Sequence, residues 1–146
     1  MDMDIEQAPL NIDSLKDALV ALEDTIAEYD ECELNSNCNT RRLRALRSGV
    51  IHNFEVAYEL CWKYMKKWLE MNISPDIVKG VTRKEFYRIA WENGLITDVK
   101  EWWGFHDIRN RTGHIYSETV AEQVFKAAVK FIATAKTFAA VLESVI

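Results

Sequence analysis

Arginine, asparagine and histidine side chains occur together in one short segment of the C-terminal half, Arg109-Asn110-Arg111-Thr112-Gly113-His114-Ile115-Tyr116. A histidine moves a proton at neutral pH, an arginine neutralises phosphate oxygens, and an amide fixes the orientation of a bound group. These three side chains can handle a phosphodiester without a metal ion.

Two backbone conformations would bring side chains of this segment together. Arg109 and His114 are about 140° apart on an unbroken helix, so a turn at Gly113 is needed for them to meet. If the helix continues, Asn110 and His114 share one face. By spacing alone, an arginine and a histidine near each other in a helical protein are usually an ordinary surface pair.

The composition favours a helical domain. The chain has 146 residues, 49% of them apolar and 28% charged, with only five Gly and two Pro. We therefore expect one domain over residues 1–146, with residues 1–11 as a disordered or irregular tail. The tail carries three acids and no apolar run, so we expect neither a signal peptide nor a membrane anchor.

The cysteines and the remaining histidines give no sign of a metal or a cofactor. Cys32, Cys38 and Cys61 cannot all pair and show no CxxC spacing, and the core is large enough to need no disulfide. A reducing cytoplasm is the location that fits. His52 and His106 are far from each other and from any carboxylate cluster, so we expect no metal ligands there.

Charge is unevenly distributed along a chain whose net charge is −5. Residues 1–34 hold eleven acids and one lysine, whereas residues 40–70 hold seven basic residues and three acids. Either the two segments pair with each other across a helix interface, or the second presents a cationic face. The second segment contains a basic cluster, which consists of Arg41, Arg42, Arg44 and Arg47. This cluster is either a solvated helix surface or a surface that steers RNA.

Apolar residues recur at intervals of three and four, the period of amphipathic helices. The resulting architecture is all-α, an up-and-down bundle of four to five helices. Asn11 or Asp13 should cap the first helix, Thr82 and Glu85 form a capping box, and Asn93-Gly94 ends a helix. The expected helices cover residues 12–31, 40–71, 83–93, 98–108 and 117–142, with a loop over residues 33–39.

Tryptophans are expected mainly in the core. Trp62, Trp68 and Trp91 lie on the apolar stripes. Trp102 and Trp103 point about 100° apart on a helix, so only one of them can face the core.

The segment at residues 109–116 resembles the Arg-x4-His-x-Tyr motif of HEPN-domain proteins, and its surroundings are similar to the subfamily of nucleotidyltransferase substrate-binding proteins. Gly49-Val50-Ile51, followed by residues 54–63 (FEVAYELCWK), looks like that subfamily's second-helix signature. Glu92-Asn93-Gly94-Leu95-Ile96 resembles its junction between the third and fourth helices. The resemblance covers residues 12–142.

This resemblance implies a homodimer with a shared cleft and a partner, a minimal nucleotidyltransferase encoded by a neighbouring gene, that acts as antitoxin. His114 would be the general base or acid that cleaves RNA, Arg109 would stabilise the transition state, and Asn110 would hold the phosphate or the ring. The partner would transfer AMP to Tyr116 and so block RNA. The same resemblance gives possible cleft-lining residues in the second helix: Tyr58, Glu59 and Lys63.

Three functions remain open. The first is a metal-independent endoribonuclease toxin. The second is a non-catalytic subunit that presents a substrate or nucleotide to the nucleotidyltransferase, which the acidic net charge favours. The third is a dimerisation bundle without a ligand. The chain is not the nucleotidyltransferase itself, because it has no Gly-Ser loop followed by spaced aspartates.

Overall fold

The protein is built from helices packed side by side, as the composition predicts. The computed structural model describes residues 10–114 and 117–146, and for His114 the backbone only. Within these residues there is no strand. The elements are α1 (Asp13–Leu34), α2 (Thr40–Asn72), α3 (Arg83–Glu92), α4 (Val99–Arg111), a 3-10 turn η1 (Thr112–His114) and α5 (Glu118–Val145).

The helix ends follow the capping residues of the sequence. Thr82 accepts a hydrogen bond from the Glu85 N–H (3.2 Å), and Gly94 has a φ of 78°, so the predicted N-cap and stop of α3 are confirmed. The capping box is only half formed, because the Glu85 carboxylate pairs with Arg88 instead of the Thr82 N–H. At the start of α1, the Asn11 side chain accepts from the Asp13 N–H at 2.8 Å. The side chains that cap the other three helices are Asn39 for α2, Asp98 for α4 and Ser117 for α5.

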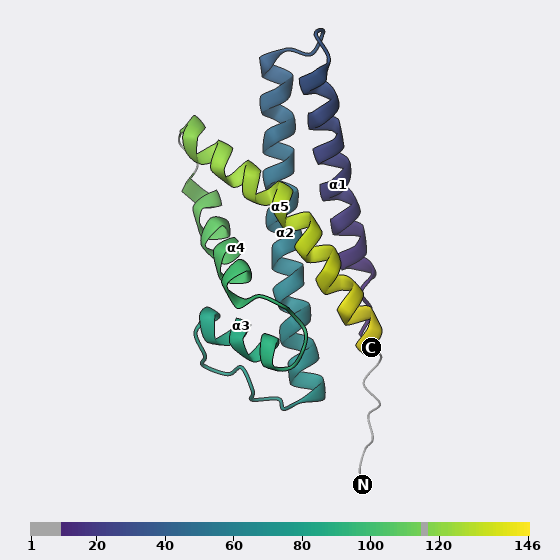
Figure 1. Ribbon diagram of the computed structural model, residues 1–146, viewed down its shortest axis with the longest axis vertical. Helices are drawn as coiled ribbons and strands as arrows, with labels where there is room; N and C mark the ends of the chain where they lie inside the picture. Colours follow the sequence, from purple (N-terminus) through teal and green to yellow (C-terminus); the bar gives the residue numbers. More distant parts are fainter. Residues whose placement is uncertain (1–9, 115–116) are drawn as a thin grey trace.

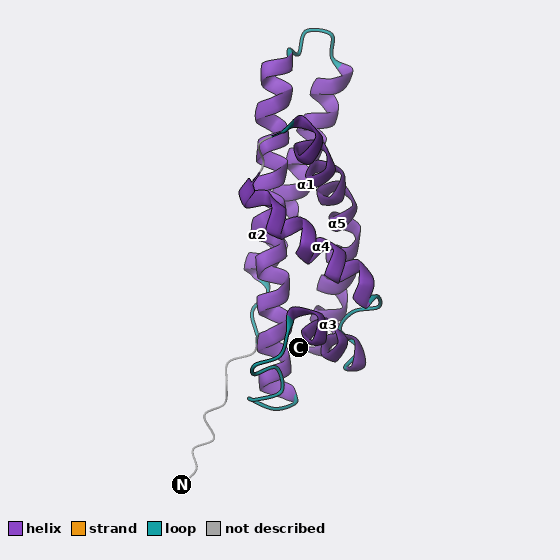
Figure 2. Ribbon diagram, turned by 90° about the vertical axis from the view of Figure 1, so that its left-hand side faces the viewer, coloured by secondary structure: helices purple, strands orange, loops and turns teal. Residues whose placement is uncertain are grey.

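Helices α1 and α2 form a long antiparallel hairpin, and α5 crosses both (Figure 1). Gly49 permits the close approach within the hairpin, because a Cβ added there would lie 3.1 Å from the Thr25 methyl group. Helix α4 packs on α5 and α2, and the short α3 packs on α4 (Figure 2). The C-terminal end of α4 is thereby held against the middle of α2.

The core is rich in aromatic rings that touch edge to face. Phe131 of α5 is fully buried, and its ring centroid lies 5.2 Å from that of Phe54 and 5.0 Å from that of Phe105. Trp102 lies beside them, 5.7 Å from Phe131. Because Phe54, Trp102 and Phe131 come from three helices, this cluster joins α2, α4 and α5.

The tryptophan predictions were right in four places and wrong in one. Trp62 and Trp68 pack against the core, Trp102 is buried, and Trp103 is 40% exposed. Trp91 was predicted to be buried but is 52% exposed. The reason is that Trp91 lies at helical spacing from the exposed Lys84 and Arg88, on the side of α3 opposite to the buried Phe86 and Ala90.

Within the described residues no ion pair joins residues 10–34 to residues 40–70, which was the first of the two arrangements considered. Among the described residues, the ion pairs of α1 are with α5, as in Lys16–Glu143 and Glu23–Lys136. Arg47 of α2 also pairs with α5, where both of its terminal nitrogens donate to Glu118 at 2.9 and 3.1 Å. This happens because α1 and α2 meet mainly through apolar residues, which leaves their charges at the flanks that α5 borders.

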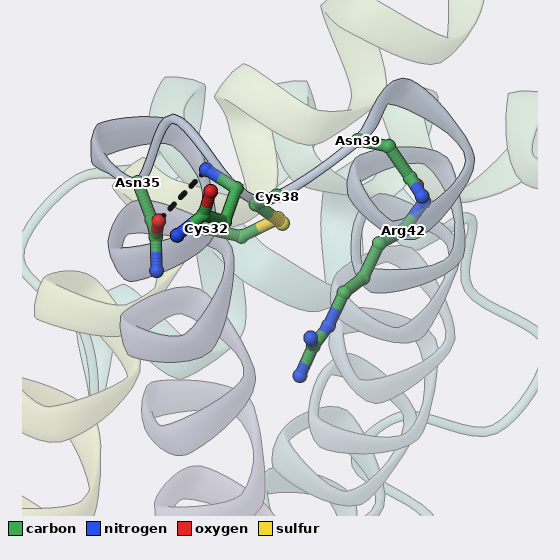
Figure 3. Close-up of a disulfide and its surroundings, with 6 residues drawn as sticks. Cys32, Asn35, Cys38, Asn39 and Arg42 are labelled. Carbon is green, nitrogen blue, oxygen red and sulfur yellow. Dashed lines mark hydrogen bonds between the residues drawn. A yellow bond between two sulfur atoms is a disulfide. The ribbon is translucent and has the colours of Figure 1, made fainter.

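Cys32 and Cys38 form a disulfide that joins the end of α1 to the start of α2 (Figure 3), with a Cα–Cα distance of 5.2 Å. Between them the Cys38 N–H donates to the Asn35 carbonyl at 2.9 Å. Cys61 is free and buried. The sequence did not predict this pairing, because the tight turn that brings residues 32 and 38 together depends on how the two helices align.

Over the residues that the structure describes, no helix combines the length and the apolar character that crossing a bilayer requires.

Candidate functional site

The residues expected to do chemistry lie where α4 ends. Arg109 and Asn110 occupy its last turn, and the chain then tightens into η1 at Thr112–His114. Of the two possibilities considered, a turn near Gly113 is therefore the one observed and a continuous α-helix is not. The turn forms without a positive φ at Gly113. The side chain of His114 and all of Tyr116 lie outside the described residues, so their roles stay predictions.

Arg109 reaches back to α2, where two carboxylates hold its guanidinium. Its Nη1 lies 3.4 Å from Glu55 Oε2, and its Nε lies 3.3 Å from Glu59 Oε1. Nη1 also donates to Thr112 Oγ1 at 2.7 Å. Nε is buried and, despite the short distance to Glu59, its N–H is not aligned for a hydrogen bond. The contact with Glu59 is therefore electrostatic rather than a directed bond.

The charges around Arg109 decide what it can bind. Two carboxylates already pair with this guanidinium, and they compete with an approaching phosphate for its charge. The Arg109 side chain is 29% exposed, so part of it can be reached from solvent. The two glutamates thus fix the direction of Arg109 and at the same time reduce the attraction it exerts on an anion.

Glu59 also holds Trp62, and Trp62 in turn carries Arg83. The second Glu59 oxygen, Oε2, accepts from the Trp62 indole N–H at 3.0 Å. The Arg83 guanidinium carbon lies 4.0 Å from the centroid of the Trp62 ring, a cation–π contact. Arg83 Nη1 donates to the Tyr58 hydroxyl at 3.2 Å. In this way α3 contributes a cation to the same surface.

Tyr58 connects Arg83 to helix α4. Its hydroxyl lies 3.0 Å from His106 Nδ1 and forms a hydrogen bond with the Tyr87 hydroxyl. His106 Nε2 lies 3.3 Å from Asn110 Nδ2. Burial raises the pKa of both the Tyr58 and Tyr87 hydroxyls, so both keep their protons at neutral pH.

His106 is held in its neutral form. Burial lowers the pKa of its imidazole below the ordinary value of 6.5, and the nearby Arg83 guanidinium lowers the pKa further. The carboxylates of Asp107 and Glu59 act in the opposite direction but with smaller effect.

Together these contacts link side chains of three helices in a row whose two ends, Arg109 and Asn110, are neighbours in the sequence. We call this group of side chains the polar ring. It runs between α2, α3 and α4, and it contains Arg109 and Asn110 of the Arg-x4-His segment. Its members are Glu59, Arg109, Asn110, His106, Tyr58, Arg83 and Trp62.

The possible cleft-lining residues of α2 divide into two groups. Tyr58 and Glu59 belong to the polar ring, whereas Lys63 is exposed and takes part in none of the contacts described above. The sequence indicated that His106 was no metal ligand, and it attached no other role to that residue. The i, i+4 spacing of His106 and Asn110 was a signal that could have found the contact between them.

Arg83 could not be found in this way. It lies 26 residues upstream of Arg109, in a helix of its own, and only the packing of α3 against α4 brings it to Tyr58. Among the described residues no group of three or more histidine, cysteine, aspartate or glutamate side chains is arranged to hold a metal ion.

The fold and the site define an all-helical protein of the HEPN-like class, in which the end of one helix presents an arginine and an asparagine beside a long helical hairpin. Within that class, the chain belongs to the family described as nucleotidyltransferase substrate binding protein like, whose model matches residues 10–144.

Relatives of known description agree with this placement. A protein of Haemophilus influenzae described as a probable ribonuclease HepT is 32% identical over 117 residues, which are 80% of each chain. A solved structure from the same organism, described as the fold of a substrate binding domain of a nucleotidyltransferase, has a TM-score of 0.83 and 28% identity. It covers 91% of this chain and 99% of its own.

A more distant structure supports the fold alone. A Thermus thermophilus protein has a TM-score of 0.60 and 24% identity, over 83% of this chain and 98% of its own.

Proposed function

We propose that this protein is a HEPN-type toxin that cleaves RNA without a metal ion and is inhibited when a partner nucleotidyltransferase transfers AMP to Tyr116. The observation that carries the proposal is the placement of Arg109 and Asn110 on the last turn of α4, with Arg109 fixed by Glu55, Glu59 and Thr112. The ribonuclease description of the 32% identical relative supports the same activity.

The proposed reaction is a transesterification. The ribose 2′-oxygen forms a bond to the adjacent phosphorus while the bond from phosphorus to the 5′-oxygen of the next nucleotide breaks. His114 takes the 2′-hydroxyl proton or returns a proton to the leaving oxygen. Arg109 stabilises the negative charge on the phosphoryl oxygens, and Asn110 orients the phosphate or the ring. The products are a 2′,3′-cyclic phosphate and a 5′-hydroxyl.

Inhibition would follow from charge and bulk. The Tyr116 oxygen forms a bond to the α-phosphorus of ATP, and pyrophosphate leaves. The attached AMP adds a negative charge and a purine two residues after His114, which repels and obstructs an RNA phosphate. We infer that the nucleotidyltransferase is the antitoxin, that a homodimer brings two such sites to one cleft, and that the pair acts in the cytoplasm.

A cleavage assay in EDTA tests the activity. Wild-type protein, Arg109→Ala and His114→Ala are each incubated with RNA, and the ends of the products are identified. We expect the wild type to produce cyclic-phosphate ends and each variant to lose at least about 100-fold in rate, the usual cost of removing one charge-stabilising or proton-transferring group. Full activity in either variant would refute the assigned roles.

Mass spectrometry tests the modification. The protein is incubated with ATP and the nucleotidyltransferase encoded beside its gene, and then weighed. The wild type should gain the mass of AMP and lose ribonuclease activity, whereas Tyr116→Phe should gain no mass. Mass gain by Tyr116→Phe would move the modification to another residue.

One observation favours a second function, a substrate-binding subunit that does no chemistry. Glu55 and Glu59 compete with a phosphate for Arg109, and the net charge of the chain is −5. Neither feature suits a protein that holds RNA by itself. No cleavage by the wild type, together with a tighter interaction between a nucleotide and the nucleotidyltransferase in its presence, would establish this function instead.

A further inference from the structure

His106 stands between two members of the polar ring and contacts both through its ring nitrogens. Nδ1 lies 3.0 Å from the Tyr58 hydroxyl, and Nε2 lies 3.3 Å from Asn110 Nδ2. His106 and Asn110 are four residues apart on α4, so their side chains lie on one face. The imidazole also packs against the ring of Trp103, with a distance of 5.3 Å between the two ring centroids.

The chemistry of each group decides which atoms donate and which accept in this row of hydrogen bonds. An amide nitrogen only donates, so His106 Nε2 must accept from Asn110 and carry no proton. The proton of the neutral ring is then on Nδ1, which donates to the Tyr58 oxygen. Arg83 donates to the same oxygen, which leaves the Tyr58 proton for the Tyr87 hydroxyl. All of these hydrogen bonds can form together only while the imidazole is neutral.

We propose that His106 is a positioning residue that fixes the side-chain amide of Asn110 through Nε2 of its neutral imidazole. The amide is then held with its nitrogen toward His106 and its carbonyl oxygen Oδ1 free to accept a hydrogen bond from a ligand. This inference rests on the proposed function only in so far as Asn110 contacts RNA.

Protonation of His106 would undo this arrangement. A second N–H would then point at the N–H of Asn110, and the amide would have to turn over to present its oxygen to the ring. The charged groups that face His106 come from three helices: Arg83 from α3, Glu59 from α2 and Asp107 from α4. Burial and Arg83 together keep the imidazole neutral, and so keep the amide in one orientation.

A double-mutant cycle tests the coupling through RNA cleavage. We compare His106→Leu, Asn110→Ala and the variant that carries both, with His52→Leu of α2 as the control for loss of an exposed histidine. We expect His106→Leu to lower kcat about tenfold with little change in KM, because Asn110 is present but misaligned. The double variant should cleave no more slowly than Asn110→Ala alone.

His106→Gln is the conservative variant, because a glutamine carbonyl oxygen can take the place of Nε2 as acceptor. Unlike an imidazole, the glutamine amide is not protonated near neutral pH. It should keep kcat within about threefold of wild type. The proposal would be overturned if the loss of kcat in the double variant were the product of the losses in the two single variants. It would also be overturned if His106→Gln cleaved RNA as slowly as His106→Leu.

A measurement without RNA separates this inference from the proposed function. In ¹⁵N–¹H spectra of a His114→Ala background, the side-chain NH₂ signals of Asn110 are assigned by their absence in Asn110→Ala. They should shift with pH in step with the ring signals of His106, and His106→Gln should abolish that shift. Signals of Asn110 that stay fixed while His106 titrates, or that shift equally in His106→Gln, would refute the positioning role even if RNA is cleaved.

Discussion

At the scale of single residues, the site depends on how strongly two glutamates compete with a phosphate for one arginine. Arg109 is the side chain to which the proposed reaction assigns phosphate stabilisation, and yet Glu55 and Glu59 already hold it. The two carboxylates limit the motion of a long side chain, which lowers the entropy cost of using it, but they compete with the phosphate for its charge.

We expect Glu59→Gln to tighten RNA binding about two- to fivefold, because the substitution removes one competing charge while Glu55 and Thr112 still orient Arg109. The dissociation constant for a short RNA, measured in the His114→Ala background, checks this expectation. Glu70→Gln is the matched control: it removes the same charge about 16 Å further along α2 and should have less effect. Weaker binding by Glu59→Gln would mean that orientation matters more than charge.

His106 should also make stability depend on pH. The fold lowers the pKa of its imidazole below 6.5 through burial and Arg83, so the folded state favours the neutral ring. Above pH 6.5 the ring is neutral in both states and its contribution is complete. As the pH falls below 6.5, the unfolded chain binds a proton first, and the free energy of unfolding decreases until the pH reaches the folded-state pKa.

Urea unfolding at several pH values between 7.5 and 5 measures this dependence. His106→Gln should have a smaller decrease over that range than the wild type, and His52→Gln, which alters an exposed histidine, should retain the wild-type decrease. Parallel curves for the wild type and His106→Gln would show that another group causes the dependence.

At the scale of elements, the ends of the α1–α2 hairpin are fixed by short-range contacts. The Asn39 side chain caps α2 by accepting from the Arg42 N–H at 2.8 Å. We expect Asn39→Ala to lower the free energy of unfolding by about 1 kcal/mol. Urea unfolding measures the loss, and Asn37→Ala in the same loop is the control, with an expected change near zero. Equal losses in both variants would show that the loop, rather than the cap, is responsible.

The Cys32–Cys38 disulfide closes a short loop at the end of the same hairpin, so its effect should be modest. For a sequence separation of 6, the loss of loop entropy in the unfolded chain corresponds to at most about 2 kcal/mol. We expect a reductant to lower the Tm of the wild type and of Cys61→Ala, but not that of Cys38→Ser.

The proposed ribonuclease activity should be the same with and without the reductant. The loop lies at the opposite end of the hairpin from α3 (Figure 1), and Arg109 contacts the middle of α2, at Glu55 and Glu59. A Tm unaffected by reductant in the wild type would mean that the bond does not stabilise the fold.

At the scale of the whole molecule, α5 joins the charges of the other two long helices. Lysines of α5 and α1 pair with acids on the facing helix, and Arg47 of α2 pairs with Glu118, which lowers the pKa of that carboxyl. Arg44 is also within 3.9 Å of Glu118. Arg41 and Arg42, in contrast, are exposed at the end of the hairpin.

If the exposed arginines steer RNA, reversing Arg41 and Arg42 to Glu should weaken binding and flatten its dependence on salt. Each phosphate contact that is lost should reduce the slope of log K against log salt concentration by about 0.7. Reversal of Lys79 and Lys84, two exposed lysines elsewhere, is the control and should leave the slope unchanged. An unchanged slope in the arginine variant would assign Arg41 and Arg42 to the solvated surface.

The sequence by itself determined the helices, because their signals are local. Apolar residues at intervals of three and four placed all five helices, and Thr82, Gly94 and Ser117 marked where helices begin or end within a few residues. It also placed Arg109 and Asn110 next to each other, since adjacent residues need no fold to meet.

Only the tertiary structure decided which distant side chains join them. The carboxylates on Arg109, the neutral state of His106 and the arrival of Arg83 at Tyr58 all depend on how α3 and α4 pack against α2. The exposure of Trp91 and the Cys32–Cys38 pairing were decided in the same way. Helical periodicity states which face of a helix is apolar, but the side chains that this face meets depend on the angle and offset between helices, which no local pattern encodes.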